Sequence, residues 1–175
     1  DDEYHASGAW IYSLINGGRD QGSQLMDGMR VGMDVGYASK GTVTWDMIYP
    51  NRQPLAKAKS EAAKHKGGSF YRCNTLQALR TALAQGWPGV VAVHVGNRFN
   101  SLSGGIAGVD RGPGNHAVCV DDLAVVRGKL VYDMPNSWGI EGYGDEGRAY
   151  LTDDHFAGTF SNHAFYVLRA AKVKT

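Results

Sequence analysis

The chain has 175 residues, of which 43% are hydrophobic and 20% charged, with a formal net charge of +1. This length and composition fit one compact globular domain. The balance of 18 basic and 17 acidic residues excludes a strong overall field that would draw the protein to nucleic acid or to an anionic membrane. The longest apolar runs, such as Gly89–Val95, fall far short of the roughly 18 residues of a membrane span.

Four segments predict helices. Apolar or helix-forming residues recur at helical spacing in residues 9–14, 25–35, 56–66 and 75–85. The first of these segments is closed by Asn16-Gly17-Gly18, which is a helix-ending signal. Asn74 is the expected N-cap of the last one, because an Asn side chain can accept a hydrogen bond from a free N–H of the first turn.

Short apolar and β-branched runs between Gly-rich turns predict strands at residues 90–95, 117–120, 123–126, 129–133, 149–151 and 164–169. Helices come first and antiparallel strands follow, which predicts an α+β protein. We therefore expect a single domain over 1–175, mainly helical in 1–66 and mainly β in 67–175.

Two short motifs suggest chemistry. His116, in Asn115-His116-Ala117-Val118, ends a Gly-rich loop and begins a strand, and Asn136-Ser137-Trp138-Gly139 follows twenty positions later. A catalytic imidazole needs a second group to fix its tautomer and orientation, and an Asn side-chain oxygen can do this. Trp138 could shield the His–Asn hydrogen bond from water and so strengthen it. A lone His before a strand is more often structural, but the joint pattern favours a catalytic pair.

Together with Gly144-Asp145-Glu146-Gly147-Arg148-Ala149-Tyr150, these motifs resemble the papain-like cysteine peptidases, in particular bacterial or bacteriophage-encoded members. The resemblance implies a papain-like α+β fold in which a helical part precedes an antiparallel, barrel-like β lobe. It also implies peptide-bond hydrolysis by a Cys-His-Asn triad. The implied site residues are His116 and Asn136 as catalytic groups, Ser137, Trp138 and Gly139 as supporting groups, and Gly22, Ser23 and Asn115 as substrate-binding groups.

The nucleophile of that triad is not found in the sequence. Family members carry a Cys on an upstream helix, preceded by a Gln, and neither occurs here. The chain begins at Asp1 without an initiator Met, so we expect it to be a piece of a longer product. Cys73 and Cys119 are expected to be buried free thiols. Cys119 should also point away from His116, because side chains alternate along a strand.

Three explanations stay open. The nucleophilic Cys can belong to an upstream segment of the same gene product, or to a separate chain. Alternatively, the chain is a catalytically inactive papain-like module with a structural, binding or assembly role, for example in a phage particle. In the third explanation, a serine replaces the cysteine as the nucleophile, and the candidates are Ser7, Ser13 and Ser23. Because the Cys has to be supplied from elsewhere, the chain alone is expected to be inactive.

The expected partners are a polypeptide substrate and the Cys-bearing segment, with neither nucleic acid nor membrane. A soluble protein is expected, and both a cytoplasmic and a virion-associated location are left open. No cofactor or metal is expected, since the remaining histidines lack ligand spacing. Asp121-Asp122 predicts a turn rather than a calcium site. Arg148 and Asp145 are expected to form a weak surface ion pair.

Overall fold

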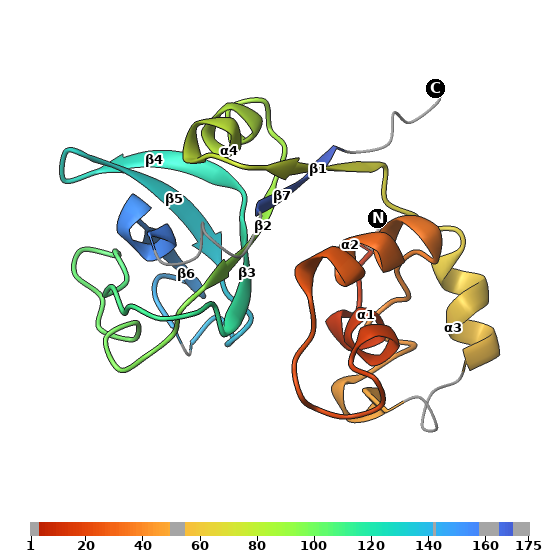
Figure 1. Cartoon of the computed structure of the whole chain (residues 1–175). Coiled ribbons are helices and arrows are strands. Elements are labelled where there is room, and N and C mark those ends of the chain that lie inside the picture. The colour runs from red at the N-terminus through yellow and green to blue at the C-terminus, as the bar shows by residue number, and fades with distance from the viewer. Residues whose placement is uncertain (1–3, 50–54, 142, 158–164, 170–175) are drawn as a thin grey trace. The chain divides into compact units, whose positions relative to one another are not determined.

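A computed structural model describes residues 4–49, 55–141, 143–157 and 165–169. The chain divides into two compact units, a helical one that ends at Ser69 and a mainly β one over Phe70–Arg169 (Figure 1). The predicted α+β class is confirmed. One residue of the sequence predictions, Ala164, lies outside the described residues.

The helical unit contains three of the four predicted helices. Its elements are α1 (Gly8–Ile15), α2 (Leu25–Asp34), the short 3-10 helix η1 (Trp45–Met47) and α3 (Leu55–Ala62). Ser7 caps α1 by accepting a hydrogen bond from the backbone N–H of Trp10 at 3.2 Å. The Trp10 side chain is completely buried, and its indole N–H donates to the carbonyl of Gly36 at 3.0 Å. A buried aromatic with a satisfied polar atom thus anchors this small core.

The β unit holds all six predicted strands and one that was not predicted. They are β1 (Ser69–Cys73), β2 (Gly89–Val93), β3 (His116–Val120), β4 (Asp122–Val126), β5 (Lys129–Pro135), β6 (Arg148–Leu151) and β7 (Phe165–Arg169). One sheet has the order β1-β7-β2-β3 and the other β4-β5-β6. The strand β1 was missed because Cys73 is its one buried residue, so it carries no hydrophobic alternation.

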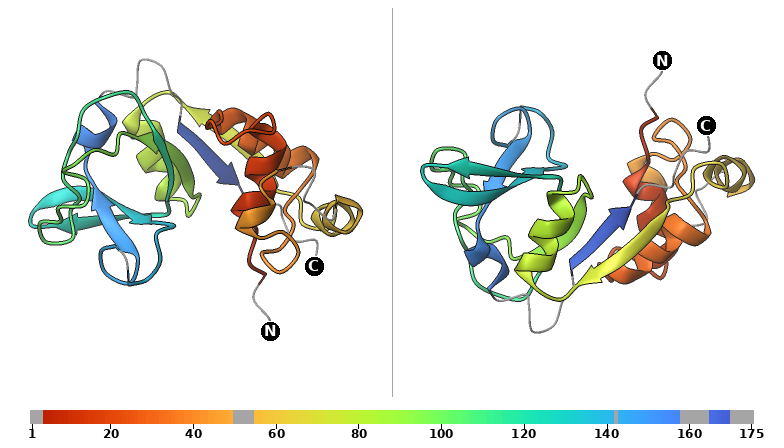
Figure 2. Two further views of the ribbon diagram at one scale, coloured as in Figure 1. Left: turned by 90° about the horizontal axis from the view of Figure 1, so that it is seen from below. Right: turned by 90° about the horizontal axis from the view of Figure 1, so that it is seen from above.

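Helix α4 (Leu76–Leu83) packs beside β2, as Figures 1 and 2 both show. Its buried face includes Leu79 and Leu83. The predicted N-cap was wrong by one residue. Thr75, rather than Asn74, caps α4, because its hydroxyl oxygen accepts from the backbone N–H of Ala78 at 3.1 Å. Both residue types can cap a helix, so composition alone does not fix the register.

A bent run of chain leads from the first sheet into the second. The strand β3 pairs with β2, and β4 pairs with β5, so the chain passes from one sheet to the other at Asp121. The backbone N–H of Asp121 donates to the carbonyl of Asp133 at 3.1 Å, which holds the second sheet against the bend. Val118 and Val120 face the core. Cys119 lies on the other face, as the alternation predicted.

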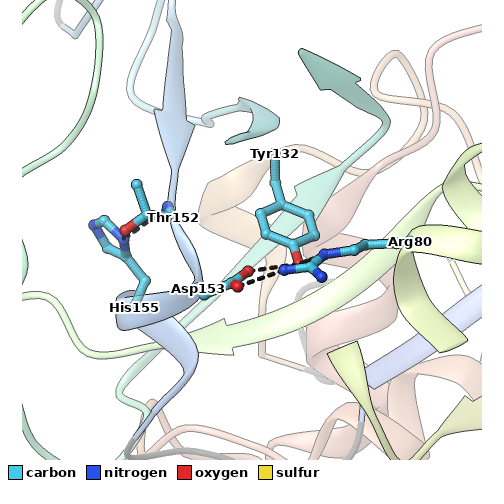
Figure 3. Close-up of polar contacts among 5 residues, drawn as sticks. All are labelled: Arg80, Tyr132, Thr152, Asp153 and His155. Carbon is cyan, nitrogen blue, oxygen red and sulfur yellow. Dashed lines mark hydrogen bonds and ion pairs between the residues drawn. The ribbon is translucent and has the colours of Figure 1, made fainter. Parts of the chain in front are cut away.

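A polar network behind α4 ties this helix to β5 and to the 3-10 helix η3 (Asp153–Phe156), as Figure 3 shows. The Arg80 guanidinium forms an ion pair with Asp153 and donates through Nε to the Tyr132 hydroxyl at 2.9 Å. The Tyr132 hydroxyl donates to Asp153 at 2.9 Å. Burial, above all, raises the pKa of Tyr132 to about 12, so its hydroxyl keeps the proton that it donates.

His155, in the same region, forms a capping box with Thr152 at the start of η3 (Figure 3). Its Nδ1 accepts a hydrogen bond from the backbone N–H of Thr152 at 3.0 Å. The side chain is buried, and this burial lowers the pKa of His155 from its ordinary value of 6.5. Its neutral form is therefore the one that the fold prefers.

This histidine predicts a pH dependence of stability. Because the pKa of His155 is lower in the folded state, the unfolded chain binds the extra proton first as the pH falls below about 6.5. As the pH falls, the free energy of unfolding should therefore decrease more steeply for the wild type than for His155→Asn. The Asn side-chain oxygen can still accept a hydrogen bond from the backbone N–H of Thr152. Urea unfolding midpoints between about pH 7 and pH 5 measure this. Parallel curves for the two proteins would contradict the prediction.

No helix among the described residues is both long enough and apolar enough to cross a membrane.

Candidate active site

The structure brings the two predicted catalytic residues together. His116 is the first residue of β3, opposite Val93 of β2, and Asn136 follows the last residue of β5. The backbone N–H of Asn136 donates to the carbonyl of Gly147 at 2.9 Å, which fixes the start of the loop. The side chains then meet, with 3.3 Å between His116 Nε2 and Asn136 Oδ1. Residues twenty positions apart thus form one contact between the two sheets.

The hydrogen bonds around Asn136 define the tautomer of His116. The oxygen Oδ1 also accepts from the backbone N–H of Ser137 at 2.8 Å, which distinguishes the oxygen from the nitrogen of the amide. Because Oδ1 can only accept, His116 Nε2 must carry the proton and Nδ1 the lone pair. Among the described residues, Nδ1 makes no hydrogen bond. An uncharged amide therefore leaves Nδ1 free to act as a base.

The amide nitrogen of Asn136 is buried and has no hydrogen-bond partner within the described part of the chain. A buried donor without a partner destabilises the fold, so this orientation of the amide lowers the stability of the protein. Such a compromise is more typical of a functional residue than of a packing residue.

The Trp138 ring lies against that of His116. Its ring centroid is 5.2 Å from that of His116, and the two rings are tilted by 30°. The side chain is 39% exposed, so the indole is partly in solvent where it borders the imidazole. The indole thereby limits the access of water to the His116–Asn136 contact, and a drier surrounding strengthens a hydrogen bond. Gly139 then turns the chain with φ 90°.

Two aromatic residues that the sequence did not single out support Trp138. Phe99 is completely buried and meets the Trp138 ring edge to face at 5.9 Å. Tyr143 stacks on Phe99 at 5.7 Å and meets Trp138 edge to face at 5.0 Å. The Tyr143 hydroxyl donates to the carbonyl of Phe99 at 2.9 Å. We call Phe99, Trp138 and Tyr143 the aromatic cluster. It holds Trp138 from the side away from solvent.

The loop before His116 is fixed by side chains that bond to backbone. One carboxylate oxygen of Asp110 accepts from the backbone N–H groups of Gly96, Arg98 and Phe99 at 2.9–3.1 Å. Asn115 accepts from the N–H of Val95 at 2.8 Å and donates to its carbonyl at 3.0 Å. The polar atoms of Asn115 are thus used within the fold, and its role in substrate binding stays a prediction.

Neither cysteine of the chain is suited to be the nucleophile. Burial raises the pKa of both thiols, to about 11 for Cys119. A raised pKa leaves almost no thiolate at neutral pH, and the thiolate is the reactive form. Cys119 also faces away from His116, on the opposite side of β3, and Cys73 ends β1 as a buried residue.

Two of the three candidate serines have structural roles. The hydroxyl of Ser7 donates to the carbonyl of Val43 at 2.6 Å while it caps α1. The hydroxyl of Ser13 donates to the carbonyl of Trp10 at 2.7 Å. Both serines are buried, so neither is presented to a substrate.

The other predicted substrate-binding residues, Gly22 and Ser23, belong to the helical unit. Gly22 has φ 85°, and its backbone N–H donates to the hydroxyl of Tyr12 at 3.0 Å. Ser23 is exposed. Their role in substrate binding stays a prediction. Within the described ranges, no group of three or more His, Cys, Asp or Glu side chains is placed to hold a metal ion.

The fold is that of the papain-like cysteine proteases. Xylellain, a cysteine protease from Xylella fastidiosa, matches with a TM-score of 0.70 and 21% identity over 98% of this chain and 72% of its own. The bromelain protease of Ananas comosus matches with a TM-score of 0.68 and 19% identity over 96% of this chain and 79% of its own.

The chain spans about half of some related structures. A ragweed pollen allergen, a cysteine protease solved in its proform, matches with a TM-score of 0.73 and 17% identity over 97% of this chain and 54% of its own. Neither a protein-family profile nor a curated protein matches the sequence. At these identities the likeness establishes the fold, and the chemistry has to be argued from the site.

Proposed function

We propose that this chain supplies the general base and its orienting amide to a papain-like cysteine peptidase. The observation that carries the proposal is the pairing of His116 Nε2 with Asn136 Oδ1 at 3.3 Å under Trp138. This contact leaves the second ring nitrogen, Nδ1, with a lone pair. The fold likeness supports the same class of chemistry, with a polypeptide as substrate.

The proposed reaction begins when Nδ1 of His116 takes the proton of a cysteine thiol, which gives a thiolate–imidazolium pair. Such pairing lowers a thiol pKa from about 8.5 to roughly 3.5–7.5. The thiolate attacks the carbonyl carbon of a peptide bond, and His116 gives its proton to the departing amine. Water, deprotonated by His116, then releases the acyl group and regenerates the thiol. Asn136 keeps the ring in one orientation throughout.

The nucleophilic Cys is proposed to come from outside these 175 residues, either from an upstream segment of the same product or from another chain. The state of the two cysteines inside the chain supports this. Both thiols have raised pKa values, and Cys119 lies on the face of β3 away from His116. The alternative is a papain-like module without catalytic activity that serves in binding or assembly.

Peptide hydrolysis by two preparations tests the proposal. The first is this chain alone, and the second is the chain together with the Cys-bearing segment from its full reading frame. We expect no turnover from the first and thiol-dependent turnover from the second. A full reading frame without an upstream Cys, or an assembled product that contains one and cleaves no peptide in a broad substrate library, would favour the inactive module.

A further inference from the structure

Arg148 makes a bidentate clamp at the junction of the two sheets. Its Nε donates to Asp133 at 3.1 Å, and its Nη2 approaches the second carboxylate oxygen of Asp133 at 3.1 Å. The same Nη2 donates to Asp121 at 2.7 Å. The expected pairing with the Asp145 side chain was wrong. Asp145 meets Arg148 through the backbone, by two hydrogen bonds of 2.8 and 2.9 Å.

The clamp joins two strands and the bend between the sheets. Arg148 begins β6, Asp133 lies within β5, and Asp121 is the residue at which β3 gives way to β4. Ala149 of β6 faces the core, so the alternation of side chains puts Arg148 on the opposite face of its sheet. One guanidinium therefore ties the bend between the sheets to the two strands beside it.

This bend controls the spacing of the candidate catalytic pair. His116 is carried by β3 in the first sheet, five residues before Asp121. Asn136 is carried by the end of β5 in the second sheet, three residues after Asp133. The contact at 3.3 Å is already near the long end of the hydrogen-bond range. A small change in the angle between the sheets would therefore open it.

We propose that Arg148 is a positioning residue that holds His116 and Asn136 within hydrogen-bond distance by fixing the bend at Asp121. Its consequence for catalysis rests on the proposed function, but the effect on geometry does not. The guanidinium suits this role because its planar fork binds a carboxylate through two parallel N–H groups, which fixes direction as well as distance. A lysine ammonium offers no such fork.

The clamp is expected to contribute more to geometry than to stability. The side chains of Arg148 and Asp121 are 41% and 37% exposed, and that of Asp133 is 22% exposed. Water screens ion pairs at such positions, and their measured contribution to stability is small. An effect of Arg148 on the site should thus be separable from general unfolding.

The Nε2 proton of His116 reports on the contact. A hydrogen-bonded, shielded imidazole proton exchanges slowly with water and gives a resolved signal in ¹H–¹⁵N NMR spectra at low temperature. We expect exchange about three- to tenfold faster in Arg148→Met, because the bond opens more often. Arg148→Lys, which keeps the charge but not the fork, should recover only part of the protection. The chain itself is used, without the Cys-bearing segment.

Arg80→Met is the matched control. Arg80 makes a comparable ion pair and hydrogen bond, with Asp153 and Tyr132, elsewhere in the β unit (Figure 3). It should lower stability to a similar extent and leave the exchange of the His116 proton unchanged. Asp121→Asn should reproduce the effect of Arg148→Met, and combining the two should add little, because both remove the same tie.

Exchange in Arg148→Met within about twofold of the wild type would overturn the proposal, since independent sites do not influence each other. Equal acceleration in Arg80→Met would overturn it as well, by showing a general loss of stability. The proposal would also be overturned if the Nε2 proton of His116 in the wild type exchanges too fast to be observed. In the assembled peptidase, Arg148→Met should lower kcat with KM unchanged. If the exchange results hold and no peptide is cleaved, the proposed function fails and the positioning role stands.

Discussion

Replacing His116 with alanine in the Cys-bearing product is expected to lower peptide turnover by about 10⁴-fold while the fold stays intact. The variant has no group to take the thiol proton and none to protonate the leaving amine, so both chemical steps lose their proton carrier. His116 is half-buried at the start of β3, so its removal leaves little unfilled space. Turnover of a peptide substrate, with circular dichroism as a check of folding, measures the effect.

His65→Ala is the matched control for this change. His65 is half-buried in the helical unit, where its ring stacks on Tyr4 at 3.7 Å. Its removal should leave turnover near the wild-type level. If His116→Ala instead unfolds the protein, His116 is a structural residue whose imidazole supports the strand, and the assignment of a catalytic base fails.

The substitution Phe99→Ala is expected to have a large effect on stability. It should lower the free energy of unfolding by about 3–5 kcal/mol, as the loss of a completely buried phenyl ring generally does. The ring also contacts both Trp138 and Tyr143, so its loss should leave the Trp138 indole freer to move. Urea unfolding gives the stability, and the line width of the Trp138 indole N–H signal in NMR spectra reports the mobility.

Phe156→Ala separates these two effects. Phe156 is also completely buried, and its ring meets those of Tyr132 and Phe165, at 5.1 Å in each case. It should cost a similar amount of stability and leave the Trp138 signal unchanged. Equal broadening of Trp138 in both variants would show that the cluster gives Trp138 no specific support.

The contact between His116 and Asn136 could be predicted from the sequence because each residue lies in a short motif. The alternation along a strand was enough to place Cys119 on the face away from His116. The raised pKa of this thiol could not be predicted, since it depends on burial by segments that are distant in the sequence.

The supporting residues were missed because their partners are far along the chain. Phe99 and Tyr143 are 44 positions apart and join through a side chain that bonds to backbone. Arg148 was assigned to Asp145, its neighbour in sequence, whereas its carboxylate partners lie 15 and 27 positions away. Which carboxylate an arginine meets is decided by the pairing of strands, and the sequence pattern indicates strands more readily than their register.

The most direct test of the central claim is the labelling of the assembled product by a thiol-directed epoxide, followed by intact mass spectrometry. We expect one added label, on the cysteine of the completing segment, and loss of labelling in His116→Ala, because the imidazole creates the thiolate. This chain alone should stay unlabelled, since both of its thiols have raised pKa values. Labelling on Cys73 or Cys119, or labelling of the upstream cysteine that is unaffected by the loss of His116, would contradict the account.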